Sequence, residues 1–374
     1  MNAKKYLGLL VGKCFKKSII FESIPNYSDN TFAIYQEFLK RGYAKKYYLI
    51  WCIEDNDVAV YKKGGLVHWN PSQRKTLTEK IRNYIYYSNR VCIISCNRFI
   101  KKERDELAIN LTHGSPLKNV KGFYRTPDYY DYIVAQSDAF IDKTDDSSYQ
   151  KKKRALGFPR NDVFSKPRKD INKLLSTKDV KYIVWYPTYR KHKNGLQTGS
   201  KNALPILHNI ENASIVNQVA RENDVIIILK PHFAQDVTEI KDLHLSNIRI
   251  IDDSFFKEHS ITSYEFLHGC DALLTDYSSV YYDYTLSDHP IGAVWEDIED
   301  FRKSPGFDMD IDFWMKGAEK IYTCQDLCEF IQRIADGKDI LAKERREIRD
   351  LANYSTDGKN SERVVDFIVK EAKL

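Results

Sequence analysis

Two histidines of the sequence follow apolar runs closely, and this placement suits proton transfer. His113 lies within residues 111–118, and His232 lies within residues 228–233. Histidine is the side chain whose usual pKa best suits removal of a proton near neutral pH. The glycine and proline that follow His113 favour a tight turn there. His113 could therefore serve as a general base, or it could be an ordinary hydrogen-bonded residue of that turn.

Other polar residues at the ends of apolar runs have the chemistry for binding phosphate. Lys230 and His232, which are separated by one residue, could together neutralise a diphosphate. Arg190 could pair with a phosphate through two hydrogen bonds. Ser278 or Ser279 could begin a helix whose first N–H groups bind phosphate, or could do no more than cap it. These residues together favour phosphate-ester transfer over hydride or acyl chemistry.

The elements that would position these residues alternate between strand-like and helix-like stretches, which predicts parallel sheets covered on both faces. The expected strands are residues 18–22, 47–53, 58–61, 65–68, 91–95, 108–112, 132–135, 182–186, 225–230, 248–251 and 271–275. The expected helices cover residues 30–41, 76–87 and 209–223. A further helix begins at the capping-box spacing of residues 262–265, and residues from 325 onward are mainly helical.

A chain of 374 residues is long enough for two domains. We expect an α/β protein with two doubly wound, Rossmann-like domains facing a cleft. The expected boundaries are a basic arm at residues 1–20, an N-terminal domain at 21–165 and a C-terminal domain at 180–350. Residues from about 160 to 180 are polar and read as a linker. Residues 351–374 are expected to form a helix that packs back on the N-terminal domain.

The positive charge is concentrated at the N-terminus. The net charge is +6, and residues 1–21 hold five lysines and no acid, which leaves 53 basic against 52 acidic residues elsewhere, or +1. A nucleic-acid-binding protein would spread basic residues along a groove, so no nucleic-acid partner is expected. Apolar residues 7, 10, 11 and 14 fall on one helical face. Residues 1–17 could thus bind an anionic membrane surface, or form a helix that packs on the domain.

The cysteines and apolar runs indicate a cytoplasmic location, and the basic arm predicts peripheral attachment to the inner face of the plasma membrane. None of the seven cysteines belongs to a zinc-binding pattern, so we expect them to be reduced and structural. No run approaches the ~20 apolar residues of a transmembrane helix. The short apolar stretch 6–12 lacks the cleavage site of a signal peptide.

Five segments in a fixed order resemble the motifs of the CDP-glycerol glycerophosphotransferase family, which builds teichoic acids and capsular polymers. The resemblance extends from about Phe21 to Ile331, and residues 21–23 with 29–30 also resemble the family's opening strand and turn. Ser115 replaces the threonine of the family's His-Gly-Thr-Pro-Leu-Lys segment. The sequence also departs from the family at residues 304–307 and 315–318, where Arg-Gly-Phe/Tyr and Pro-Gly-Pro are usual. The matching segments are residues 111–118, 157–162, 186–190, 230–232 and 275–280.

This resemblance implies a glycosyltransferase-B-like fold, with the nucleotide donor held mainly by the C-terminal half. His113 would activate the acceptor hydroxyl and His232 would contact the donor's phosphates, and these two are the expected catalytic residues. The donor's phosphates and nucleotide would be bound by Thr188, Arg190, Lys230, Asp276, Ser278 and Ser279. The acceptor side would include Gly114, Ser115 and Lys118. No metal is implied, although Asp276 could serve a cation, and no cofactor is implied beyond CDP-glycerol as the donor substrate.

The implied reaction transfers glycerol phosphate from CDP-glycerol to a hydroxyl of a lipid- or polymer-linked acceptor and releases CMP. A ribitol-phosphate transferase that uses CDP-ribitol would share the phosphate-binding residues. A nucleotide-sugar glycosyltransferase of the same fold is a further alternative. A non-enzymatic membrane scaffold is disfavoured because His113 and His232 are both present.

Overall fold

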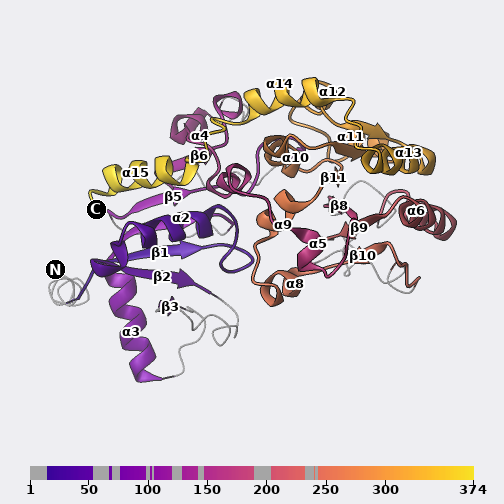
Figure 1. The fold of residues 1–374 in the computed structure, drawn as a ribbon. Coiled ribbons are helices and arrows are strands. Elements are labelled where there is room, and N and C mark those ends of the chain that lie inside the picture. The colour runs from indigo at the N-terminus through magenta and orange to yellow at the C-terminus, as the bar shows by residue number, and fades with distance from the viewer. Residues whose placement is uncertain are drawn as a thin grey trace. The chain divides into compact units, whose positions relative to one another are not determined.

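The protein divides into two compact units, as the computed structural model in Figure 1 shows. The structure describes residues 15–53, 67–69, 76–97, 102, 105–119, 129–141, 147–188, 204–231, 240 and 243–374. As far as they are described, unit 1 comprises Met1–His113, Tyr124–Asp162 and Asp357–Leu374, and unit 2 comprises Gly114–Phe123 and Val163–Thr356. Each unit contains one parallel sheet.

The sheet of unit 1 has seven strands in the order β3-β2-β1-β4-β5-β6-β7, and every neighbouring pair is parallel. The strands are β1 (Ser18–Glu22), β2 (Tyr48–Cys52), β3 (Val67–Trp69), β4 (Arg90–Ser95), β5 (Leu107–Asn110), β6 (Tyr132–Ala135) and β7 (Lys153–Ala155). The α-helices described in this unit are α2 (Asp29–Lys40), α3 (Leu77–Ser88), α4 (Ser147–Lys152) and α15 (Asn360–Ala372). Short 3-10 turns lie at η1 (Tyr43–Lys45), η4 (Asp138–Phe140) and η5 (Pro159–Ser165), the last of which runs into unit 2.

The C-terminal helix α15 completes the core of unit 1. Val364, Val365 and Ile368 are fully buried in the same apolar cluster as Phe21 and Trp51 of strands β1 and β2. Helix α15 packs beside α2. The last eighteen residues therefore belong with the first sheet rather than with the residues that directly precede them.

The sheet of unit 2 has six parallel strands in the order β10-β9-β8-β11-β12-β13. They are β8 (Lys181–Trp185), β9 (Val225–Leu229), β10 (Ile248–Ile250), β11 (Ala272–Thr275), β12 (Ile291–Val294) and β13 (Glu319–Ile321). Strand β9 reads Val-Ile-Ile-Ile-Leu and is wholly buried, as expected for a central parallel strand covered on both faces. The described helices are α5 (Ile171–Leu174), α6 (Ile210–Glu222), α8 (Asp253–Glu258), α9 (Ser263–Gly269), α10 (Val280–Tyr284), η6 (Thr285–Ser287), α11 (Ile298–Lys303), α12 (Ile311–Trp314), α13 (Cys324–Ala335) and α14 (Ala342–Ala352).

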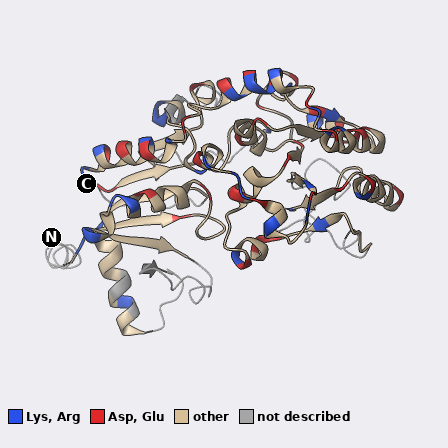
Figure 2. Ribbon diagram, in the orientation of Figure 1, with Lys and Arg blue, Asp and Glu red and all other residues tan. Residues whose placement is uncertain are grey.

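Local signals in the sequence set several helix starts. The Asn209 side chain accepts hydrogen bonds from the N–H groups of Glu211 and Asn212 at the start of α6. Thr262 and Glu265 form the expected capping box of α9. The outer faces of α14 and α15 carry charges of both signs side by side, which suits helices with one face in solvent (Figure 2).

The structure also differs from the sequence-based expectations in places. Strands β7, β12 and β13 were not expected, and the expected linker at 160–180 contains η5 and α5. Residues 1–14, which hold most of the basic arm, and the expected strand at 58–61 lie outside the described residues. Within the described part of the chain, no helix has both the length and the apolar character needed to cross a membrane.

Candidate active site

In unit 1, His113 lies on a short loop that leaves the carboxyl end of β5. The strand ends at Asn110, two residues earlier than expected, so Leu111 and Thr112 belong to the loop. The His113 residue is exposed, whereas Leu111 is fully buried. Thr112 has a φ of +52°. The loop therefore presents an accessible imidazole on a backbone anchored in the core.

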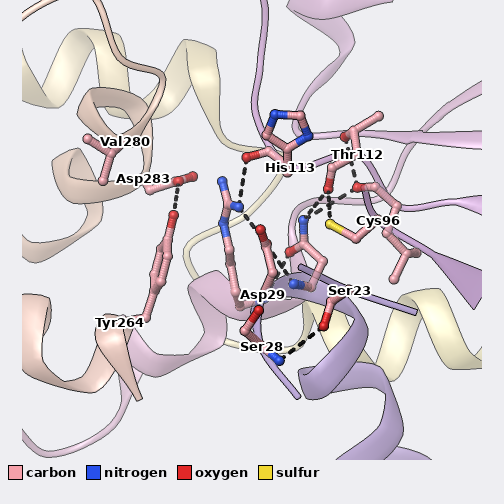
Figure 3. A network of polar contacts seen from close by, with 12 residues as sticks. Ser23, Ser28, Asp29, Cys96, Thr112, His113, Tyr264, Val280 and Asp283 are labelled. Carbon is pink, nitrogen blue, oxygen red and sulfur yellow. Dashed lines mark hydrogen bonds and ion pairs between the residues drawn. The ribbon is translucent and has the colours of Figure 1, made fainter. Parts of the chain in front are cut away.

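Side chains from distant segments bind the backbone of this loop (Figure 3). The Asn30 Nδ2 donates to Thr112 O at 2.8 Å, and the Cys96 thiol donates to the same oxygen at 2.9 Å. The Arg160 Nη1 donates to His113 O at 2.8 Å and lies 2.5 Å from Asp29 Oδ1. These contacts of Asn30, Cys96 and Arg160 were not predicted from the sequence. Burial raises the pKa of the Cys96 thiol well above its usual value, so the thiol stays protonated and can donate.

In unit 2, the residues that follow His113 are held by the segment around residues 304–308. The Leu117 carbonyl accepts from Asp308 N at 3.0 Å, and Asn119 N donates to Gly306 O at 2.8 Å. Lys118 and Phe307 form a short antiparallel bridge. Residues 304–307 are one place where the sequence departs from the family pattern, and they shape the backbone on the expected acceptor side.

Gly114 packs directly against Ser279 within unit 2. A Cβ atom at position 114 would lie 2.3 Å from Ser279 Oγ, so only glycine fits without movement. The Tyr282 hydroxyl donates to the Pro116 carbonyl at 3.3 Å. The structure thus brings Gly114 of the expected acceptor segment onto Ser279 of the expected donor segment. Ser115 lies between these anchored residues.

Asp276 follows β11 and makes backbone contacts that the sequence did not predict. Its carboxylate is fully buried and accepts hydrogen bonds from Thr188 N at 2.8 and 2.9 Å. The Tyr277 N–H donates to the same carboxylate at 2.6 Å. Asp276 fixes the backbone at Thr188, and its expected part in binding the donor's phosphates or nucleotide stays a prediction.

The two serines before α10 do not cap it as expected. The Ser279 backbone is already helical, and its side chain makes no capping hydrogen bond. Ser278 Oγ accepts from Val280 N at 3.5 Å, which is too long to be a strong bond. Helix α10 is held instead by its buried Asp283, whose Oδ2 accepts from the Tyr264 hydroxyl at 2.6 Å (Figure 3).

Lys230 lies at the carboxyl end of β9 and already has an acidic neighbour. Its Nζ is 3.1 Å from Asp253 Oδ1 and 5.9 Å from the ring centroids of Tyr186 and Phe256. Thr188, 6% exposed, lies beyond the end of β8 in the same sheet. Arg190 and His232 lie outside the described residues. Among the residues that are described, no group of three or more His, Cys, Asp or Glu could hold a metal ion.

The fold defines the class of protein to which the chain belongs. It is similar to the wall teichoic acid polymerase TagF, with a TM-score of 0.71 over 99% of this chain and 93% of that one, at 21% identity. It is also similar to a putative UDP-N-acetylglucosamine 2-epimerase from Listeria monocytogenes, with a TM-score of 0.55, 12% identity and 96% of each chain covered. The chain therefore has the two-domain α/β architecture of glycosyltransferase-B-like proteins, which confirms the expected fold class.

Sequence comparison then gives the family. Residues 9–370 match the family described as CDP-Glycerol:Poly(glycerophosphate) glycerophosphotransferase, and the chain belongs to that family. It is 26% identical, over 77% of this chain and 76% of the relative, to the teichoic acid poly(glycerol phosphate) polymerase of Bacillus spizizenii. It is also 25% identical to the protein of the same name from Bacillus subtilis. That match covers 95% of this chain but only 49% of the relative. The chain is a CDP-glycerol glycerophosphotransferase family enzyme, as the motifs indicated.

Proposed function

We propose that the chain transfers glycerol phosphate from CDP-glycerol to a hydroxyl group of a teichoic-acid-type acceptor. The acceptor oxygen attacks the β-phosphorus, the bond from that phosphorus to the bridging oxygen breaks, and CMP leaves. His113 takes the proton of the attacking hydroxyl. Fixed groups stabilise the charge that develops on the phosphoryl oxygens.

The observation that carries this proposal is the placement of His113. The imidazole belongs to an exposed residue, while the carbonyl of the same residue is bound by the buried Arg160. A general base must be both accessible and held in a fixed geometry. Gly114, the next residue along the chain, packs on Ser279, one of the two serines expected at the donor phosphates.

The donor would be bound by residues of unit 2 at the carboxyl ends of β8, β9 and β11. Parallel α/β sheets bind nucleotides at this edge. Thr188 and Lys230 lie there, as do Ser278 and Ser279, and Arg190 and His232 follow in sequence. The choice of CDP-glycerol as the donor is supported by a similar solved structure, a TagF variant that was soaked with CDPG.

A ribitol-phosphate transfer is the second candidate. The chain is 24% identical to the teichoic acid ribitol-phosphate primase of Bacillus spizizenii over 72% of its own length and 71% of the relative. The two donors differ only in the alcohol, so residues that bind the diphosphate would serve both.

The test is incubation of the purified chain with a lipid-linked acceptor and CDP-glycerol, CDP-ribitol or common UDP-sugars in turn. We expect CMP release with CDP-glycerol, little release with CDP-ribitol and no UDP from the sugars. Faster turnover of CDP-ribitol would replace the first candidate by the second. Release of UDP would overturn both.

We further propose that residues 1–17 attach the enzyme to the anionic inner face of the plasma membrane, where a lipid-linked acceptor would lie. Five lysines without an acid favour such a surface. Deletion of residues 1–17 should abolish sedimentation with anionic vesicles and leave CMP release onto a short soluble acceptor unchanged. Equal sedimentation of the full and shortened chains would contradict the attachment.

A further inference from the structure

The backbone next to the expected base has an unusual conformation. Thr112 has a φ of +52°, in the left-handed region that β-branched residues rarely adopt. Backbone outliers of this kind persist only where the surrounding structure enforces them, and they concentrate at functional sites. The conformation of Thr112 sets the direction in which the chain leaves toward His113.

Hydrogen bonds from three sides enforce this conformation. Thr112 N donates to Asn110 Oδ1 at 2.8 Å, and Thr112 Oγ1 lies 2.8 Å from Leu111 O and 3.1 Å from Val134 O, either of which can accept its hydrogen. The Thr112 carbonyl accepts from Asn30 and Cys96, as described above. Asn30 is itself fully buried, and its Oδ1 accepts from Arg160 N at 3.2 Å. The backbone N–H and the carbonyl oxygen of Thr112 are therefore both fixed by hydrogen bonds to other residues of unit 1.

Arg160 extends this restraint from Thr112 to the base itself. Its Nη1 carries two hydrogens and donates them to His113 O at 2.8 Å and to Asp29 Oδ1 at 2.5 Å. The Arg160 side chain is 6% exposed and that of Asp29 is 17% exposed, so solvent screens this ion pair only weakly. A charge-assisted bond in such surroundings restricts the His113 peptide more strongly than a bond at the surface would.

The segment that carries Arg160 is itself rigidly supported. Asp162 accepts hydrogen bonds from Asn360 N and Ser361 N, both at 2.8 Å, and so caps helix α15. Gly157 has a φ of +80°, and a Cβ there would lie 2.1 Å from Asn360 Oδ1. Arg160 therefore lies between two contacts that fix its segment against the C-terminal helix of unit 1.

We propose that Arg160 is a positioning residue for the reaction: it holds the peptide of His113 so that the imidazole meets the acceptor hydroxyl. The inference rests on the proposed role of His113 as the base. In this proposal Arg160 binds the backbone of His113 and not the donor or the acceptor. Its effect therefore passes through the placement of the imidazole, and this distinguishes it from the phosphate-binding residues.

Arg160→Gln should slow the chemical step without weakening donor binding. A displacement of about 1 Å at a catalytic group costs on the order of 100-fold in rate, so we expect kcat to fall by about that factor. The KM for CDP-glycerol should change less than about threefold. Arg160→Lys should recover part of the loss, because an ammonium group can still donate to both oxygens but without the fixed geometry of guanidinium.

Arg41→Gln is the matched control. Arg41 also belongs to unit 1, pairs with carboxylates (Asp366, 2.5 Å; Glu37, 2.7 Å) and donates to a backbone carbonyl (Glu362 O, 3.2 Å). Among the described residues, none of its contacts is with the His113 loop. A similar fall in kcat for Arg41→Gln and Arg160→Gln would mean that the loss of any such ion pair in unit 1 slows the reaction. That result would overturn the inference.

A double-mutant cycle with His113→Ala separates this inference from the proposed function. If Arg160 acts through His113, Arg160→Gln slows the otherwise native chain but not the residual CMP release of His113→Ala. Equal slowing in both backgrounds would refute the positioning role and leave the base assignment intact. Near-native turnover of His113→Ala would instead refute the base assignment. If circular dichroism shows that Arg160→Gln does not fold, Arg160→Lys takes its place in the cycle, with the same two outcomes deciding.

Discussion

Replacing Asp276 by asparagine changes one atom of a fully buried group, and the structure indicates a large cost. The carboxylate accepts from the N–H groups of Thr188 and Tyr277, at 2.6 to 2.9 Å. In Asp276→Asn one oxygen becomes an amide nitrogen, which would face the Thr188 N–H as a second donor. Hydrogen bonds to a charged group contribute about 1.5–3 kcal/mol each, and a buried donor without an acceptor costs about 1–3 kcal/mol.

We therefore expect Asp276→Asn to lower the free energy of unfolding by about 3 kcal/mol. For a unit of this size, that corresponds to a fall in Tm of about 6–12 °C. Differential scanning calorimetry of the purified chain measures this shift. Because Asp276 fixes the backbone at Thr188, we also expect the KM for CDP-glycerol to rise at temperatures where the variant is folded.

Asp252→Asn is the matched control for the same chemical change in the same unit. Asp252 caps α8 from an exposed position, and asparagine is as good as aspartate at that position of a helix. We expect its Tm to change by no more than about 1 °C. Equal Tm values for Asp276→Asn and Asp252→Asn would show that the buried carboxylate does not hold the Thr188 backbone, and would refute the reasoning.

Three further predictions concern other contacts. Gly114→Ala should lower the free energy of unfolding by about 1–3 kcal/mol through its clash with Ser279. Ser279→Gly in the same chain should restore part of that lost stability. Full stability of Gly114→Ala in urea unfolding would show that the clash is absent. Burial lowers the pKa of His289 from 6.5 to about 4, so the folded chain binds fewer protons than the unfolded chain between those pH values and loses stability as the pH falls through them. His289→Gln should lose less stability than the native chain between pH 6.5 and 4.5, and an unchanged pH dependence would contradict this. Asp162→Ala should destabilise α15 by about 1–2 kcal/mol, seen as faster amide hydrogen exchange in that helix; native exchange rates would count against the cap.

The parallel sheets were predictable because their central strands are continuous apolar runs. Strands 18–22 and 132–135 were predicted with the bounds that the structure has. The missed strands β7 and β13 are three residues long and include lysine, glutamate or arginine. They are strands only because a longer neighbour supplies the pairing, and this information lies in the tertiary structure rather than in local composition.

The candidate site was predictable to a lesser extent. Residues at the carboxyl ends of strands could be found from the sequence, because chain order places them at one edge of a sheet. The contacts that fix them join Asn30 to Thr112 and Asp29 to Arg160, 82 and 131 residues apart. No local sequence pattern predicts contacts between residues so far apart in the chain. The contact of Asp276 with the Thr188 backbone was not predicted for a related reason, because the direction of its side chain depends on the neighbouring strand.

The role of His113 as the general base is tested most directly by measuring donor binding and turnover on the same variant. His113→Ala should bind CDP-glycerol with a native Kd in isothermal titration calorimetry, yet release CMP at least about 100-fold more slowly in the presence of acceptor. Native binding with near-native release of CMP would contradict the account, because the proton of the acceptor would then be taken by another group.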